Sequence, residues 1–82
     1  MQIVYLPKTK KHFRQLDKKQ ISRIINAIEL LPTTPDLGKQ LVGKLRGKRS
    51  LRVWPYRVVY SLDQKQNLII IEAVQHRKEV YR

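Results

Sequence analysis

Two arginines in adjacent β-favouring runs have the residue type and spacing to bind a phosphate group. Arg52 alternates with Leu51 and Val53, and Arg57 lies among apolar and aromatic residues in the following run. Because successive side chains of a strand point to opposite faces, a hairpin would bring both guanidiniums to one face. The planar donor fork of arginine matches phosphate, which would relieve the repulsion between them. Alternatively, both are solvated residues that protect the edge of the sheet.

A second group of candidates lies in the last seven residues, directly after the last predicted strand. His76 can gain or lose a proton near neutral pH, Arg77 and Arg82 carry charge, and Tyr81 offers a ring for base stacking. For this segment alone, a frayed basic tail is the simpler interpretation. We expect His12, which stands in a basic segment without a nearby partner, to be a surface residue of a helix.

The chain is strongly basic. Its 82 residues include 18 Lys and Arg but only 6 Asp and Glu, which gives a formal net charge of +12. This imbalance predicts an acidic partner: RNA, DNA, an anionic membrane or an acidic protein. For RNA, we expect contacts from the densest basic stretch and from the last residue of the chain, namely Lys44, Arg46, Lys48, Arg49 and Arg82.

Missing residue types and motifs exclude several kinds of site. The chain has no Cys, which excludes disulfides, thiolate zinc sites and cysteine nucleophiles. Its two histidines are far apart in the sequence and no carboxylate cluster accompanies them, so we expect no metal site. Glycine-rich phosphate loops and the nucleophile elbow of serine hydrolases are also missing, and we expect no cofactor.

The composition is that of one small folded domain covering residues 1–82. No apolar run reaches the roughly 18 residues of a membrane-spanning helix, and the N-terminal residues lack the apolar region of a secretory signal. At 41% hydrophobic residues the chain is too apolar to be a disordered basic tail. We therefore expect a cytoplasmic protein that is not bound to a membrane.

The elements that must position the candidate residues begin with a strand and two helices. Residues 3–6 form a short β-favouring run that Pro7 ends, and residues 8–16 form a basic helix with a thin apolar face. Asp17 is a suitable N-cap for a second helix, which Pro32 and Pro35 end. The apolar stripe of this second helix has helical spacing and consists of Ile21, Ile24, Ile25, Ile28 and Leu31.

Three strands follow a glycine-containing connection over residues 36–48. Residues 51–54 and 56–62 are predicted strands joined by a tight turn at Trp54 and Pro55, and residues 63–67 form a second turn. Residues 68–74 are nearly all apolar, as in a strand covered on both faces. The predicted fold is α+β with the order β-α-α-β-β-β, in which a helical hairpin packs on one face of a small, mostly antiparallel sheet.

Three motifs in this order resemble the RelE/ParE toxin superfamily. Residues 43–53 read GKLRGKRSLRV, residues 56–60 read YRVVY, and residues 76–82 read HRKEVYR. The resemblance spans essentially the whole chain and implies the same fold. It further implies a toxin of a type II toxin–antitoxin pair, which a partner antitoxin with an acidic segment holds inactive.

RelE-like members enter the ribosome and cut mRNA without a metal, through attack of the 2′-hydroxyl on the adjacent phosphate. By this resemblance, Arg57 would bind the scissile phosphate, Arg77 would stabilise charge or aid the leaving group, and Tyr81 would orient or stack on the nucleotide. Arg52 matches a basic strand residue of the ribonuclease site. The partners implied are the antitoxin, the ribosome and mRNA.

The sequence departs from the family pattern where the proton acceptor is concerned. Ser50-Leu51-Arg52 stands where well-known members have two lysines, and the glutamate base of other members has no counterpart between residues 44 and 57. Since arginine hardly deprotonates, we expect His76 to be the acid or base. Two alternatives are a ParE-like toxin that binds gyrase without catalysis and a basic RNA-binding module without activity.

Overall fold

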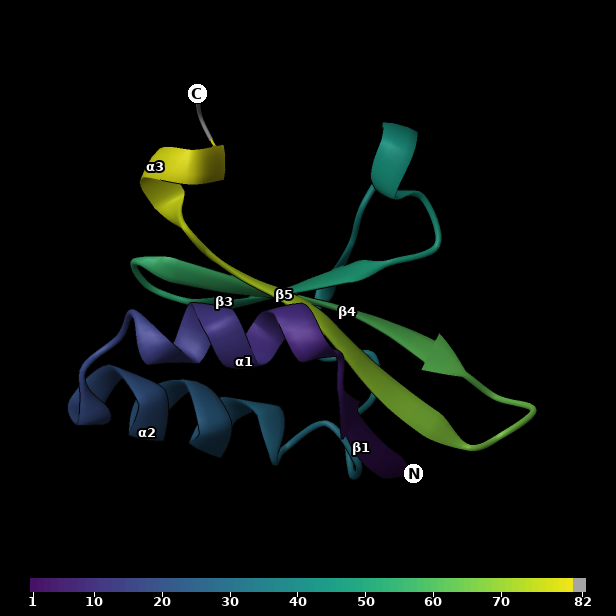
Figure 1. Cartoon of the computed structure of the whole chain (residues 1–82). Helices are drawn as coiled ribbons and strands as arrows, with labels where there is room; N and C mark the ends of the chain where they lie inside the picture. The colour runs from purple at the N-terminus through teal and green to yellow at the C-terminus, as the bar shows by residue number, and fades with distance from the viewer. Residues whose placement is uncertain (81–82) are drawn as a thin grey trace.

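A five-stranded sheet carries two helices on one face, as the computed structural model shows for residues 1–80 (Figure 1). The strand order is β1-β5-β4-β3-β2, and only the β1–β5 pair is parallel. In chain order the elements are β1 (Gln2–Tyr5), α1 (Pro7–Arg14), α2 (Lys18–Ile28), β2 (Lys39–Gln40), the 3₁₀ turn η1 (Gly43–Leu45), β3 (Arg49–Val53), β4 (Tyr56–Asp63), β5 (Leu68–His76) and α3 (Arg77–Val80).

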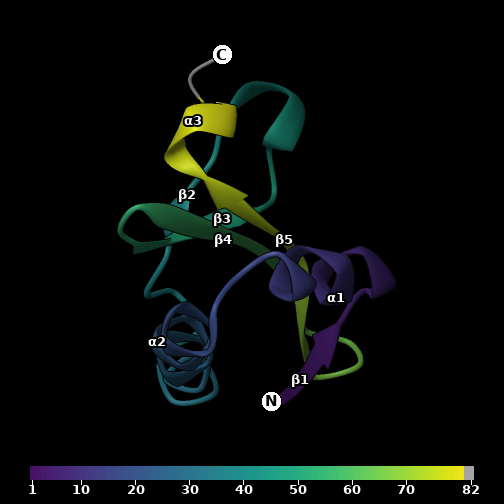
Figure 2. The ribbon, with the colours of Figure 1, turned by 60° about the vertical axis from the view of Figure 1, so that its left-hand side comes forward.

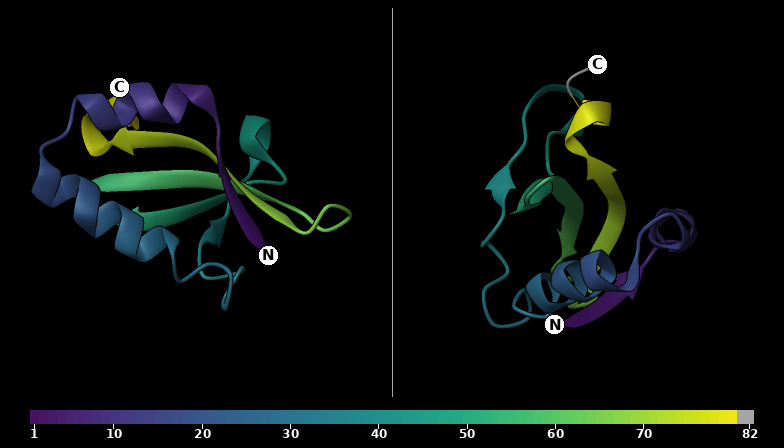
Figure 3. Two further views of the ribbon diagram at one scale, coloured as in Figure 1. Left: turned by 60° about the horizontal axis from the view of Figure 1, so that its bottom comes forward. Right: turned by 90° about the vertical axis from the view of Figure 1, so that its left-hand side faces the viewer.

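The α+β architecture is confirmed, and three short elements are added to the predicted order. β2 and η1 lie within the predicted connection, and α3 follows β5. Figure 2 and Figure 3 show that η1 and α3 lie on the side of the sheet away from α2. No helix within residues 1–80 has the length and apolar character needed to cross a bilayer.

The helices form and pack largely as their sequences predict. The Asp17 side chain accepts a hydrogen bond of 2.9 Å from the backbone N–H of Gln20, which caps α2. From the predicted stripe, Ile24, Ile28 and Leu31 are fully buried. Helix α2 contacts β3 and helix α1 contacts β5, so together the two helices cover one face of the sheet.

Strand alternation divides β3, β4 and β5 between a core face and an open face. Leu51 pairs with Val58, and both are buried in the core. On β5, Ile69 and Ile71 are fully buried but Ile70 is only half-buried. The prediction that this strand is covered on both faces is therefore wrong at Ile70, because α1 and α2 lie on the same side of the sheet, and holds only at Ala73 and Val74, which are both buried.

Tyr60 fixes the loop that leads into β2. Its ring is fully buried, and its hydroxyl donates to the carbonyl oxygen of Pro35 and accepts from the N–H of Gly38, each at 2.8 Å. Burial is the main reason why the pKa of Tyr60 is raised above its ordinary value. Gly38 has no room for a side chain, since a Cβ there would lie 2.6 Å from the Tyr60 ring.

Candidate phosphate-binding site

The structure confirms the expected pairing of the two strand arginines. Arg52 of β3 and Arg57 of β4 are direct cross-strand partners in the hairpin. Alternation places them on the open face, opposite to Leu51 and Val58. The two side chains thus leave paired positions of one hairpin on the same face, where an anion can contact both.

Gln75 orients Arg57 on this face. Arg57 pairs with Gln75 across β4 and β5, and its Nε donates a hydrogen bond of 2.8 Å to Oε1 of Gln75. This bond uses one donor of the guanidinium and leaves the two terminal nitrogens available. The terminal nitrogens are the donors of a bidentate contact with a phosphate oxygen pair.

The third arginine of the site joins through Trp54. The guanidinium carbons of Arg52 and Arg77 lie 4.9 Å and 5.1 Å from the centroid of the indole ring. We call Arg52, Arg57 and Arg77 the arginine cluster. Three guanidiniums close together can bind a phosphodiester and stabilise the extra negative charge that develops when its phosphorus is attacked.

The turn between β3 and β4 is anchored from two other elements. Nη2 of Arg23 in α2 donates to the Trp54 carbonyl oxygen at 2.9 Å. The backbone N–H of Arg77 donates to the Pro55 carbonyl oxygen at 2.8 Å, which ties the start of α3 to the turn. The Trp54–Pro55 peptide bond is cis. The two hydrogen bonds, from Arg23 and from the Arg77 N–H, explain why residues from β3, β4 and α3 converge at one end of the sheet.

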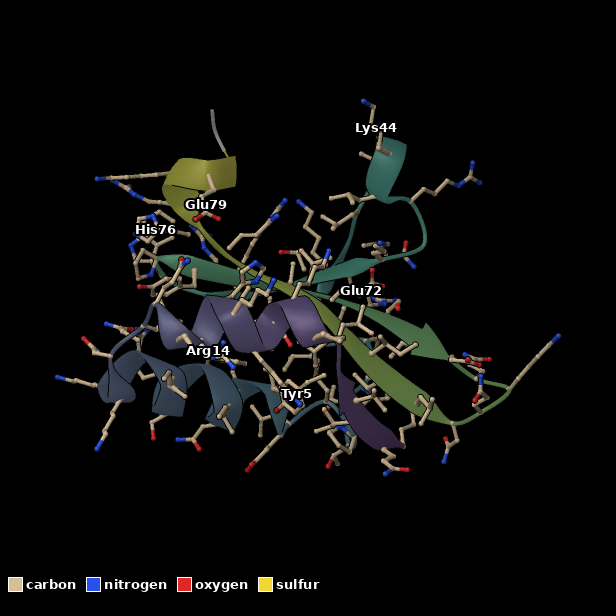
Figure 4. All side chains as sticks on the ribbon, in the orientation of Figure 1. Tyr5, Arg14, Lys44, Glu72, His76 and Glu79 are labelled. Carbon is tan, nitrogen blue, oxygen red and sulfur yellow. The ribbon has the colours of Figure 1, made fainter. Side chains whose placement is uncertain are left out.

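His76 does not share the open face with the arginine cluster. It pairs with Tyr56, one position along from the Arg57–Gln75 pair, so it points to the other side of the sheet. Its ring packs edge-on against Tyr56 at 5.2 Å, and its Nδ1 accepts a hydrogen bond from the Lys78 N–H. Figure 4 shows His76 beside Glu79 at the end of β5.

His12 is a structural residue, and its expected role as surface filler is wrong. Its Nδ1 accepts a hydrogen bond of 3.1 Å from the backbone N–H of Val74, a residue of β5 beyond the end of the β1 pairing. The histidine thereby satisfies a donor that β1 is too short to reach. His12 and His76 line one cavity of about 160 Å³, together with Gln15, Leu16, Tyr56, Val74 and Glu79.

The basic residues between 44 and 49 have different environments. Lys44 and Arg46 are exposed, and Figure 4 shows Lys44 at the tip of η1, away from the sheet. Arg49 donates to the carbonyl oxygens of Asp36 and Gly38, at 3.3 Å and 2.8 Å, and so supports the loop. A groove of about 560 Å³ beside η1 is lined by Gln40, Leu41, Val42, Gly43, Arg46, Gly47, Lys48 and Arg49.

Lys48 is paired with Glu72, the residue of β5 that the β4–β5 register skips between Ile71 and Ala73. The Lys48–Glu72 pair is the only ion pair within residues 1–80, and the β4–β5 register shifts beside it. Burial alone would raise the pKa of the Glu72 carboxyl. Hydrogen bonds from Lys48 and Ser61 and the charges of Lys48 and Lys8 outweigh burial, so the pKa is lowered.

The lowered pKa of Glu72 predicts a loss of stability in acid. A carboxyl whose pKa is lower in the folded state stabilises the fold above its unfolded pKa, and this contribution disappears as the pH falls through the folded pKa. We expect the melting temperature to fall as the pH drops towards and below 4.5, the ordinary value for this group. When the melting temperature of Glu72→Gln is measured at a series of pH values, the decrease that protonation of Glu72 causes should be missing.

The matched control is the same change at Glu29, an exposed residue of the helical side. The melting temperature of Glu29→Gln should fall in acid as it does in the unmodified protein. If the melting temperature falls in acid by the same amount in the unmodified protein and in Glu72→Gln, the protonation of Glu72 does not change the stability of the fold.

Two predicted site residues, Tyr81 and Arg82, lie outside the described residues. Within residues 1–80, no three His, Cys, Asp or Glu side chains are placed to hold a metal ion together. Two contributors to the site were not predicted from the sequence, Gln75 and the indole of Trp54. No pattern in the sequence indicated Gln75, because its contact with Arg57 depends on the register of β4 against β5, whereas an aromatic residue between two arginines could have indicated Trp54.

A family model described as the ParE toxin of a type II toxin–antitoxin system, parDE, matches residues 3–81. Among curated proteins, Toxin RelG of Mycobacterium tuberculosis is 37% identical over 46 residues. That alignment covers 56% of this chain and 53% of the relative, so it spans about half the length of each protein.

Solved structures share the fold at low sequence identity. The RelBE2 toxin–antitoxin complex of M. tuberculosis contains a chain with a TM-score of 0.84 and 24% identity, covering 93% of this chain and 96% of that one. The RelB–RelE complex of Methanococcus jannaschii gives 0.76 and 22%, with 95% and 94% covered. The isolated Escherichia coli RelE toxin gives 0.78 and 17%, with 98% and 89% covered.

Proposed function

Because this chain belongs to the RelE/ParE superfamily of type II toxin–antitoxin toxins, we propose that it is an endoribonuclease that cuts mRNA on the ribosome. The observation that supports this activity is the arginine cluster on the open face of the sheet. A cleaving toxin needs charges that are fixed around one phosphodiester, and a hairpin with an anchored turn provides them.

In the proposed reaction the 2′-oxygen of a ribonucleotide attacks the adjacent phosphorus. The 2′-hydroxyl gives up its proton to water as its oxygen bonds to phosphorus, and the bond from phosphorus to the 5′-oxygen breaks. The 5′-oxygen takes up a proton from water and leaves as a hydroxyl, and a 2′,3′-cyclic phosphate remains. Arg57, held by Gln75, contacts the non-bridging oxygens, where negative charge grows in the transition state. Arg52 and Arg77 share that charge, and Tyr81 is proposed to stack on a flanking base.

The predicted acid–base role of His76 can be tested with His76→Asn, whose Oδ1 can replace Nδ1 as the acceptor for Lys78. Because His76 points away from the arginine cluster, we expect the cleavage rate to stay within about twofold of the unmodified protein. Its dependence on pH between about 6 and 8 should also stay the same. A large loss that removes one limb of the pH profile would return His76 to the catalytic residues.

We also propose an acidic antitoxin segment as the physiological partner. The formal net charge of +12 makes the chain repel itself, and an acidic segment would neutralise part of it. The related structures from M. tuberculosis and M. jannaschii are toxin–antitoxin complexes. Binding of this kind stabilises the folded state by mass action and covers the basic surface.

The direct test uses purified protein and ribosomes programmed with a defined mRNA. Cleavage is scored by mapping new 5′ ends, with the same mRNA free in solution as the control for ribosome dependence. We expect new 5′ ends in the mRNA on programmed ribosomes. We expect no such ends in the same reaction with Arg57→Ala. Intact mRNA in all reactions would reject the proposed activity.

Inhibition of DNA gyrase, which the resemblance to ParE-like toxins implies, is the second candidate function; the matching family model is described as a ParE toxin, and that description names no target. A gyrase-binding toxin needs no group placed at a phosphodiester. A supercoiling assay with purified gyrase separates the candidates. Inhibition that persists in Arg57→Ala, together with intact mRNA on ribosomes, would support the gyrase activity.

A further inference from the structure

We propose that Trp54 is a positioning residue that holds Arg52 and Arg77 together as one phosphate-binding unit. The inference rests on the proposed function for the identity of the ligand, a single-stranded RNA phosphodiester. Trp54 carries no charge and provides no acid or base. It acts through the two arginines that its ring contacts.

The Trp54 ring contacts both arginines. One indole ring has two guanidinium carbons within 5.1 Å of its centroid, one from β3 and one from α3. The negative face of an aromatic ring attracts cations, and tryptophan provides the strongest such attraction among the side chains. The ring therefore offsets the repulsion between Arg52 and Arg77 and restricts both to its vicinity.

The guanidiniums of Arg52 and Arg77 have no polar partner within residues 1–80. Within the described part of the chain, neither Arg52 nor Arg77 forms an ion pair or a side-chain hydrogen bond, whereas Arg57 is held by Gln75. Among the ion pairs, hydrogen bonds and cation–π contacts of residues 1–80, only those with the Trp54 ring involve the two guanidiniums. Their donors stay available for an anion, because the ring attracts the charge without accepting a full hydrogen bond.

Trp54 is an exposed residue, although it is large and apolar. The side chain is 48% exposed and contributes nothing to the buried core, so a tight turn gains little stability from an aromatic residue at this position. The turn itself is fixed through backbone oxygens, by Arg23 at Trp54 and by the Arg77 N–H at Pro55. A large indole on a turn anchored in this way is explained by the arginines that contact it.

The experiment uses the fact that the chain contains a single tryptophan. Intrinsic fluorescence therefore reports on this ring alone. The ligand is a short RNA with 2′-O-methyl groups, which lacks the nucleophile and cannot be cleaved. We expect its binding, followed independently by the anisotropy of a dye on the RNA, to change the tryptophan emission of the full-length protein at the same midpoint.

Variants separate positioning from general structure. Trp54→Leu should weaken RNA binding about tenfold, since two cation–ring contacts are lost, and Trp54→Phe should recover most of that loss. In an Arg52→Ala background, where only Arg77 remains to be positioned, Trp54→Leu should cost only about threefold. Leu30→Ala, at another exposed apolar residue, is the control and should bind RNA normally.

The outcomes separate the positioning role of Trp54 from the nuclease activity. Equal losses from Trp54→Leu in both backgrounds, or an emission that stays constant while anisotropy saturates, would overturn the positioning role. If RNA binding shows the expected coupling while mRNA on ribosomes stays intact, the positioning role holds and the nuclease activity fails. Melting temperatures of all variants confirm that the compared proteins are folded.

Discussion

Arg57→Ala should reduce cleavage of ribosome-bound mRNA by a factor of a hundred to a thousand. Removing one preorganised donor from a developing anion costs roughly 2.7–4 kcal/mol of transition-state stabilisation, which corresponds to that factor. The fold should persist, because Arg57 lies on the open face and its Nε bond to the half-buried Gln75 can be replaced by water. Single-turnover cleavage rates and circular dichroism measure the two effects.

Two further variants show whether geometry or charge is responsible. Arg14→Ala removes the same charge from α1, on the helical side (Figure 4), and should cleave at the normal rate. Arg57→Lys keeps the charge but loses the planar fork, so its rate should fall between those of the unmodified protein and Arg57→Ala. A melting temperature that collapses in Arg57→Ala would instead identify a structural arginine.

Ile28→Ala should lower the free energy of unfolding by about 2–5 kcal/mol. Ile28 is fully buried where α2 meets the sheet, and the alanine leaves a cavity that neighbouring side chains fill only in part. A domain of this size loses about 4–8 °C in melting temperature for each kcal/mol. Thermal and urea unfolding should therefore both show a large decrease.

Ile25→Ala is the matched control on the same helix. Ile25 is half-buried, so removal of its side chain exposes less apolar surface and opens a smaller cavity. We expect a clearly smaller decrease than for Ile28→Ala. Equal decreases would mean that α2 packs through a different face.

The features that follow from local periodicity could be predicted from the sequence. The cross-strand pairing of Arg52 and Arg57 follows from the period of two in a strand and from the turn at Trp54–Pro55. The start of α2 follows from the capping side chain of Asp17, and its buried face follows from isoleucines at helical spacing. In each case the pattern that predicts the feature lies within one short segment of the sequence.

The features that depend on long-range contacts could not be predicted. His12 accepts from Val74, 62 positions away, and Lys48 pairs with Glu72, 24 positions away. The irregularity in the β4–β5 register, beside which Glu72 lies, leaves no recognisable pattern in an apolar run. The orientation of His76 away from the arginine cluster depends on the register of β4 against β5, which composition does not determine.

The parallel pairing of β1 with β5 has a consequence for how the protein is made. Residues 2–5 pair with residues 68–71, so β1 remains without this partner until residue 71 has been translated. Such non-local pairing delays the completion of the sheet. The arginine cluster depends on α3, which is translated later still. The three arginines therefore come together only after α3, the last of the described elements, has been synthesised.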